Sequence, residues 1–266
     1  MARVELPTSR LRARRRRRRS RLVLACCAGV VLLFGIVAGL SHLPFLQVRV
    51  VEVSGTATLA TSTLESYIKN EIAGQFAYVF PKKNIFLYPK QAIALGLLAE
   101  FPELQAADVH AQNFHTIAAE VAEREQKALW CQDEHCYLMD QSGAVYVPAP
   151  AGTEGLVAYH GKATGERLPR QYLSAKGFES LFALVDALSQ KPSLGIVESV
   201  YVDAQGDAQA VFASGFELKF ALSDAGGDVF ERFSLALGAD PFLGRSLAAF
   251  EYLDLRFGDK LYYKLK

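Results

Sequence analysis

The chain has 266 residues and a formal net charge of only +1, but its charges are unevenly distributed. Ten arginines and a single acidic residue, Glu5, lie in residues 1–21, so residues 22–266 carry a net negative charge. Domains that bind nucleic acid are usually basic, and the part of the chain after residue 21 is therefore not predicted to bind nucleic acid.

Residues 22–40 contain no charged side chain and are long enough to cross the hydrocarbon core of a bilayer, about 30 Å, as a helix. Basic residues beside such a helix remain in the cytoplasm, which predicts a disordered cytoplasmic tail at 1–21 and an extracytoplasmic part at 41–266. The arginines also suit nucleic acid or anionic lipid. A cleaved signal peptide is the other alternative, but the apolar segment is longer than usual and lacks a clear cleavage site. An uncleaved membrane anchor is favoured.

The next segment, residues 46–124, has the pattern of a small α+β module. A strand is predicted within 46–55, and a capping-box pattern at 62–65 begins a helix with Leu64 and Ile68 on its apolar face. A second helix begins near Pro89, buries Ile93, Leu97, Leu98 and Phe101, and ends at Pro102. Alternating residues then predict strands near 107–111 and 117–121. The order β-α-α-β-β can bury enough surface to fold as a unit.

Residues 125–266 are predicted to form a mainly antiparallel β domain with flanking helices. The predicted strands are a hairpin over 128–140 and segments at 144–147, 156–159, 195–202, 208–213, 216–222, 248–257 and 260–266. Amphipathic helices are predicted at 174–190 and 224–237. The overall prediction is an α+β chain with a single N-terminal transmembrane helix, a β-α-α-β-β module and this β domain.

Two cysteines, Cys131 and Cys136, lie on either side of a short turn in the predicted hairpin. In an oxidising compartment this spacing favours a disulfide. Free thiols and a metal site remain alternatives, although no second pair of ligands occurs at the spacing of a zinc site. Cys26 and Cys27 lie within the apolar segment and are interpreted as small residues that lipid tolerates.

No common catalytic, cofactor-binding or metal-binding motif was found, so neither an enzyme nor a cofactor is predicted. Asp254 is close to Arg256, and a cross-strand ion pair on the face of a sheet explains the two better than catalysis does.

The segment 260–266 is predicted to lie at a sheet edge, where backbone groups are unpaired. Its lysines, Lys260, Lys264 and Lys266, would prevent aggregation at such an edge. Alternatively, Tyr262 and Tyr263, beside Leu261 and Leu265, would anchor a partner that adds a strand. The pattern alone leaves both interpretations open.

Taken together, the order of these segments resembles the bacterial cell-division family FtsQ/DivIB. The residues that carry the resemblance are Val48, Val51, Val53 and Gly55, the segment FPKKNIF at 80–86, Glu123-Arg124 with Trp130, Asp140 with Gly143, and YLDLRF at 252–257. The family resemblance implies a POTRA domain at 46–124 and a β domain at 125–266. It also implies a non-catalytic scaffold of the division septum (the divisome), located at midcell in the inner membrane.

The resemblance further implies that small coiled-coil membrane proteins, FtsB and FtsL, are the partners. In the family, FtsB pairs with the closing strands. The corresponding residues here are Tyr252, Leu253, Asp254, Leu255, Arg256, Phe257, Leu261, Tyr262, Tyr263 and Lys264. The chain departs from the family in lacking a proline soon after Arg124, and its cysteine pair is not a general family feature. A POTRA-bearing transport or assembly factor of the cell envelope and an unrecognised extracytoplasmic enzyme remain alternatives.

Overall fold

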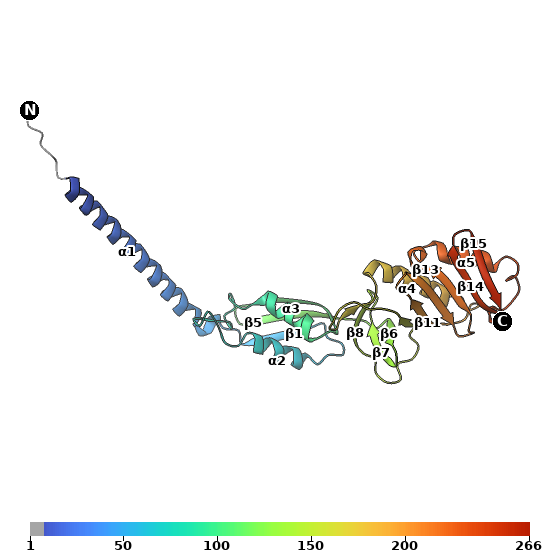
Figure 1. Ribbon diagram of the computed structural model, residues 1–266. Helices are drawn as coiled ribbons and strands as arrows, with labels where there is room; N and C mark the ends of the chain where they lie inside the picture. Colours follow the sequence, from blue (N-terminus) through green and yellow to red (C-terminus); the bar gives the residue numbers. More distant parts are fainter. Residues whose placement is uncertain (1–7) are drawn as a thin grey trace, which may run out of the picture. The chain divides into compact units, whose positions relative to one another are not determined.

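The computed structural model describes the backbone of residues 8–266 and the side chains from residue 16 onward (Figure 1). These residues form a mixed α+β protein with one long apolar helix and one large, mostly antiparallel sheet. The chain divides into two compact units. The first unit contains the N-terminal helix, continues to Ala99 and includes Ala106–Ala122; the second consists of Glu100–Gln105 and Glu123–Lys266.

The N-terminal helix α1 (Thr8–Ser41) is longer than the apolar segment. Residues 1–7 lie outside the described residues, but residues 8–21, predicted to be disordered, are helical. Arginine is a good helix former, and an existing helix extends at little cost. Within the described residues, one segment, Arg16–Ser41, is long and apolar enough to span a membrane. The helix ends shortly before Pro44, as predicted, and the 3-10 turn η1 (Pro44–Leu46) follows.

The first unit contains a three-stranded sheet with the order β1-β5-β4, in which β1 runs parallel to β5. Its strands are β1 (Val50–Ser54), β4 (Leu104–Ala111) and β5 (Thr116–Glu123). The predicted first strand is shorter than expected because the Val48 amide donates to the Lys83 carbonyl and does not join the sheet. Gly55 follows β1 with φ +89°, and a Cβ there would lie 1.9 Å from the Val121 carbonyl oxygen. Only glycine fits this position.

The helices of the first unit are α2 (Thr61–Glu71) and α3 (Lys90–Glu100). They bury Leu64 and Ile68 from α2 and Ile93 and Leu97 from α3, as predicted, whereas Leu98 and Phe101 are only partly buried. The predicted capping box is wrong. The helix begins two residues earlier, with Ala60 instead of Ser62 at the N-cap and no side-chain cap, so Ser62 lies inside the first turn and cannot cap it.

A short hairpin between the two helices was not predicted. It consists of β2 (Gln75–Phe76) and β3 (Phe80–Pro81), joined by a three-residue loop. Ala77 and Tyr78 in this loop have φ values of +50° and +61°. Glycine and asparagine usually occupy positions with positive φ. Because neither residue occurs at 77 or 78, the sequence does not predict this turn.

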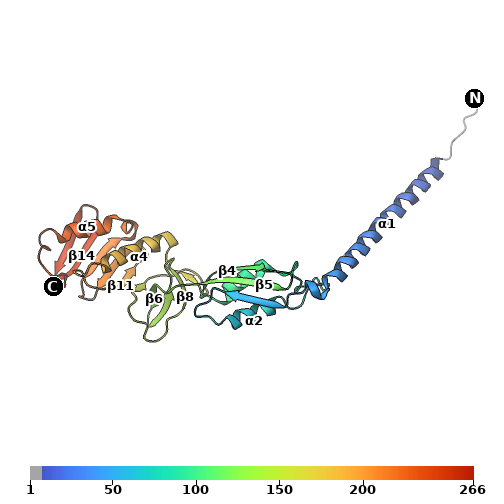
Figure 2. The same ribbon diagram turned by 180° about the vertical axis from the view of Figure 1, so that it is seen from behind.

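The second unit is built on a ten-stranded sheet with the order β10-β8-β7-β6-β9-β11-β12-β13-β14-β15 (Figure 2). The strands are β6 (Ala128–Gln132), β7 (His135–Met139), β8 (Ala144–Pro148), β9 (Ala158–His160), β10 (Arg170–Gln171), β11 (Val197–Val202), β12 (Asp207–Phe212), β13 (Glu217–Ala221), β14 (Phe250–Phe257) and β15 (Lys260–Leu265). All except β10 correspond to predicted segments. The pairs β6–β9, β9–β11 and β13–β14 are parallel, and the other neighbouring pairs are antiparallel.

Two helices, α4 (Ala175–Ser189) and α5 (Asp228–Leu237), supply apolar side chains to the core of the second unit. The hydroxyl of Ser174 accepts a hydrogen bond from the Gly177 amide and caps α4. The helix α5 begins four residues later than predicted, because η2 (Leu222–Asp224) forms a separate 3-10 turn before it. A further 3-10 turn, η3 (Leu247–Ala249), precedes β14. Cys131 and Cys136 face each other across the β6–β7 hairpin and form a disulfide.

Candidate partner-binding edge

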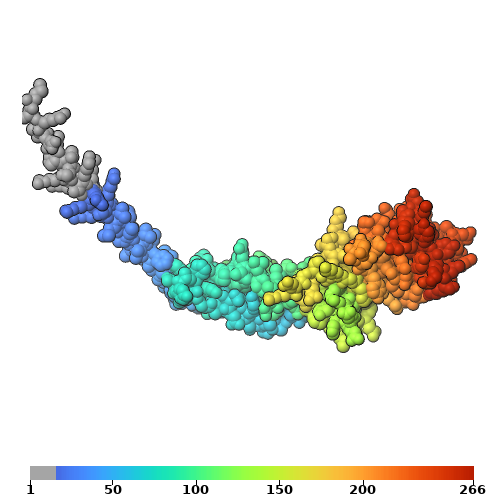
Figure 3. All heavy atoms as spheres, in the orientation of Figure 1, coloured from blue at the N-terminus to red at the C-terminus, as the bar shows by residue number. Residues whose placement is uncertain are grey.

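The strand β15 lies at one edge of the large sheet. Its neighbour β14 pairs in parallel with β13 on one side and antiparallel with β15 on the other. Among the described strands, β15 pairs with β14 alone, so the backbone groups on its outer side lack a strand partner. Figure 3 shows the C-terminal strands, in red, at the surface of the second unit. The predicted edge position of this segment is confirmed.

Every side chain of β15 is exposed. Because successive side chains of a strand point to opposite faces, Leu261, Tyr263 and Leu265 share one face, and the intervening residues share the other. Opposite Tyr263 in the ladder is Leu253, which is fully buried in the core. The apolar face of β15 therefore continues the core-facing side of β14.

This apolar face is partly packed and partly open. The Tyr263 ring lies edge-on to Phe242 and Phe250, at centroid distances of 5.6 and 6.1 Å, and those two rings stack on each other at 4.3 Å. Leu261 and the exposed Leu235 of α5 line a hollow of about 350 Å³. The aromatic contacts hold β15 in place and leave apolar area for another surface to cover.

The opposite face of β15 is more polar. The Tyr262 ring lies edge-on to Phe257, with centroids 5.1 Å apart. The Lys264 Nζ contacts a Glu251 carboxylate oxygen at 2.6 Å, and this hydrogen bond raises the pKa of Lys264. This face of the edge therefore combines aromatic rings with an exposed ion pair between Lys264 and Glu251.

The acidic residue that was considered as a catalytic candidate is occupied by an ion pair. The guanidinium of Arg256 donates to both carboxylate oxygens of Asp254, at 2.9 and 2.6 Å, and also contacts Asp207 on β12. Burial opposes ionisation of Asp254, but the hydrogen bonds from Arg256 outweigh it and lower the pKa of Asp254. Asp254 and Arg256 do form an ion pair, but both lie on β14, so the predicted cross-strand arrangement is wrong for this pair; the contact of Arg256 with Asp207 is the one that links β14 to β12.

The structure separates the predicted partner-binding residues into two groups. Leu253, Asp254 and Leu255 are buried, so they support the edge and cannot contact a partner through their side chains. The residues available to a partner are Phe257, Leu261, Tyr262, Tyr263 and Lys264, together with the partly exposed Tyr252 and Arg256. The burial of Leu253 and Leu255 was predictable from the sequence, because residues two positions apart on a strand share one face.

Two residues of α5 that support this edge were missed by the sequence analysis. One is Leu235, described above. The other is Arg232, whose guanidinium donates to the Leu255 carbonyl at 2.6 Å and to the carbonyl of Gly258 in the β14–β15 turn. The apolar periodicity of α5 predicts which of its faces is buried, but not which strand its polar side chains reach.

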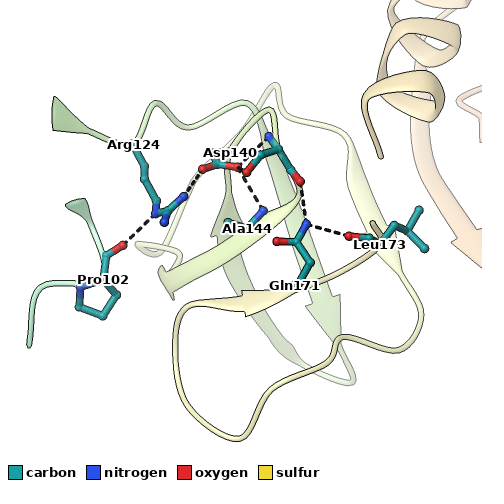
Figure 4. A network of polar contacts seen from close by, with 7 residues as sticks. Pro102, Arg124, Asp140, Ala144, Gln171 and Leu173 are labelled. Carbon is teal, nitrogen blue, oxygen red and sulfur yellow. Dashed lines mark hydrogen bonds and ion pairs between the residues drawn. The ribbon is translucent and has the colours of Figure 1, made fainter. Parts of the chain in front are cut away.

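A second polar cluster in the same unit surrounds Asp140 (Figure 4). Its Oδ2 accepts from Arg124 Nη1 at 2.5 Å, and its Oδ1 accepts from the Ser142 amide, the Ser142 hydroxyl and the Ala144 amide. Arg124 Nε also donates to the Pro102 carbonyl at 3.1 Å. The cluster joins three separate chain segments of the second unit.

The Asp140 side chain is only 4% exposed. Burial opposes its ionisation, but the hydrogen bonds from Ser142, Arg124 and the Ala144 amide outweigh this effect and lower the pKa of Asp140. Each carboxylate oxygen already has at least one partner, so the group is suited to holding the fold together rather than to moving a proton. Among the residues with described side chains, no group of three or more His, Cys, Asp or Glu is arranged to hold a metal ion.

No protein-family model matches the chain. No curated protein matches its sequence either.

Proposed function

We propose that this chain is a single-pass membrane scaffold of the FtsQ/DivIB type, which binds small coiled-coil membrane proteins at the edge strand β15. It has no catalytic role of its own in this proposal. It acts by holding its partners close together at the division septum, because two weak contacts on one anchored molecule reinforce each other.

The proposed topology follows from α1. The apolar segment Arg16–Ser41 is long enough to span a bilayer, and the arginines that precede residue 22 favour the cytoplasmic side. Residues 41–266 are then extracytoplasmic, in the compartment where the Cys131–Cys136 disulfide would be stable. The anchor belongs to the inner membrane in this proposal.

The proposed POTRA assignment for residues 46–124 is supported by element order. The main elements of this segment follow one another as β1, α2, α3, β4 and β5, which is the β-α-α-β-β order that the family resemblance implies. The hairpin β2–β3 is an addition between the two helices.

The observation that best supports partner binding is the exposed edge at β15. Its outer backbone groups have no strand partner in the described part of the chain, and both of its faces carry exposed aromatic or apolar side chains. An extended segment of FtsB or FtsL that pairs with β15 would satisfy the backbone groups and cover Leu261 and Tyr262. Lysines alone would be enough to protect an edge from aggregation. The two tyrosines add exposed aromatic surface, which favours partner binding over protection.

The test is co-purification of FtsB-like and FtsL-like proteins with the full chain and with two tyrosine variants. Tyr262→Lys changes the edge, and Tyr201→Lys changes an interior strand of the same sheet, β11; these tyrosines are 50% and 47% exposed. We expect Tyr262→Lys to lose the partners and Tyr201→Lys to retain them. Equal recovery with both variants, each shown to be folded, would contradict the proposed edge.

The septal location is tested separately with a fluorescent fusion to the full chain. The proposal requires a band at midcell in dividing cells. Uniform fluorescence over the envelope would argue against a divisome scaffold and would favour a general envelope assembly factor.

A further inference from the structure

The hairpin β2–β3 packs against the apolar segment of α1. The Phe80 ring lies edge-on to Phe34 of α1, with centroids 5.4 Å apart. The His42 ring nitrogen Nε2 donates to the Val79 carbonyl at 2.8 Å. These contacts belong to one compact unit, and they attach the hairpin directly to the side of the helix.

The position of Phe34 along α1 places the hairpin beside the predicted membrane segment rather than beyond it. Phe34 lies seven residues before Ser41, the last residue of the helix, which corresponds to about 10 Å of helix axis. The junction is also held by Asn84, which is buried and donates from Nδ2 to the Ser41 carbonyl at 2.9 Å. If α1 spans a bilayer, the hairpin is therefore at the depth of the headgroups and the adjoining ends of the acyl chains.

The loop of this hairpin has an unfavourable backbone conformation, and the aromatic side chains at this end of the hairpin, Phe76 and Tyr78, are exposed. Ala77 and Tyr78 are both in the left-handed region, which is unfavourable for residues with a side chain. Tyr78 is nevertheless 96% exposed, and Phe76 at the other side of the loop is 67% exposed. A strained loop that presents two bare aromatic rings indicates a surface that covers them.

Other exposed aromatic residues lie at the same end of the first unit. Phe45 lies in η1, four residues after the end of α1, and Phe114 lies in the β4–β5 turn, next to the start of β1. The Phe86 ring contacts the Phe114 ring at 6.2 Å. Apart from α1, these residues and the two hairpin rings are all the exposed aromatic residues among the described side chains of the first unit: Phe45, Phe76, Tyr78, Phe86 and Phe114. We name them the aromatic collar.

We propose that the aromatic collar inserts into the headgroup region of the bilayer that α1 spans. This inference depends on the proposed membrane anchor. Aromatic side chains are enriched at membrane interfaces, and the basic residues Arg49, Lys82 and Lys83 in the same segments suit anionic lipid headgroups. The contact between Phe80 and Phe34 favours lipid over a protein partner as the occupant, because it brings the hairpin alongside the apolar segment itself.

The test measures the depth of single tryptophans in the full chain reconstituted into vesicles of phosphatidylcholine and phosphatidylglycerol. Tyr78→Trp and Phe114→Trp place the probe in two separate parts of the collar. Leu95→Trp is the matched control, because Leu95 is 68% exposed in the same unit but lies on α3, outside the collar. The single native tryptophan, Trp130, is buried in the second unit, and its emission is subtracted.

Lipids brominated near the carbonyl end of the acyl chain quench tryptophans at the interface. We expect the two collar tryptophans to lose most of their emission and to shift to the blue, while Leu95→Trp stays unchanged. Reconstituted vesicles contain no partner protein, so quenching reports contact with lipid. If either probe position disturbs folding, the other gives the same measurement independently.

Two results would overturn the inference, and flotation distinguishes them. If the full chain floats with the vesicles but the collar probes are quenched no more than Leu95→Trp, the anchor stands and the collar does not contact lipid. In that case the collar faces protein or water. If the full chain does not float, the membrane anchor fails, and the collar proposal fails with it.

Discussion

Replacement of Arg124 by methionine would leave a buried carboxylate without its charged partner. The Oδ2 atom of Asp140 would lose its contact with Arg124, whereas Oδ1 would keep its three hydrogen bonds to Ser142 and Ala144. Removing one partner of a buried ion pair typically costs about 3–5 kcal/mol. We therefore expect Arg124→Met to lower the free energy of unfolding of the second unit by about that amount.

The measurement is denaturant unfolding of the full chain, followed by the fluorescence of Trp130. This residue is the only tryptophan and is buried in the second unit, so its signal reports that unit. The control is Lys127→Met, which removes the exposed ion pair between Lys127 and Glu125 and should leave the midpoint unchanged. If Arg124→Met shifts the midpoint no more than Lys127→Met, the Asp140 cluster does not stabilise the unit as argued here.

The pH dependence gives an independent check on the same pair. Because the pKa of Asp140 is lowered by folding, its contribution to stability is present above its unfolded pKa, about 3.9, and is lost as the pH falls through the folded value. In Arg124→Met the carboxyl remains buried with fewer contacts to its charged form, so its pKa rises. The cost of Arg124→Met should therefore be largest at neutral pH and should shrink below about pH 4 as Asp140 protonates.

Two further predictions concern the hairpin disulfide and the turn after β1. Thiol labelling of the unreduced chain should modify only Cys26 and Cys27, and replacing Cys131 and Cys136 by alanine should lower the stability of the second unit by about 2 kcal/mol, measured through Trp130. Labelling at Cys136 without reductant would contradict the disulfide. Gly55→Ala should destabilise the first unit by about 2 kcal/mol or more, seen as faster hydrogen exchange in β1 and β5, because the added Cβ meets the Val121 carbonyl. The Trp130 transition should not move in that variant, and protection of β1 equal to that of the parent would refute the close approach.

Local periodicity was sufficient to predict most elements of the second unit. Phe216, Leu218 and Phe220 alternate with charged residues, and all three are buried where β13 meets the core. The apolar residues of α4 recur at helical spacing, and Phe178 and Leu181 are fully buried. In both elements the buried face is determined by residues close in sequence, so the local hydrophobic pattern is enough to predict it.

Features that depend on distant residues were not predictable in this way. The two-residue strand β10 exists only through its pairing with β8, and the β2–β3 hairpin depends on a backbone conformation that Ala77 and Tyr78 do not favour. At the candidate site, the edge position of β15 was predictable, but the support from Arg232 was not. That contact joins residues more than twenty positions apart, and the hydrophobic periodicity of the sequence does not predict contacts at that separation.

The three-residue strand β9 has a mechanical consequence for the proposed scaffold, which would be anchored through α1 and bound at β15. Hydrogen bonding across the large sheet passes from β6 to β11 through β9 alone, with β15 beyond β11. Side chains reinforce this narrow point: Trp130 donates to the Gly161 carbonyl and Tyr172 donates to the His160 carbonyl. The parallel pairing of β13 with β14 is equally short, with three residue pairs, so tension applied at β15 is expected to part the sheet at β9 or between β13 and β14. Parting at β9 would separate the strands from β11 to β15 as one piece, whereas parting between β13 and β14 would separate β14 and β15 alone.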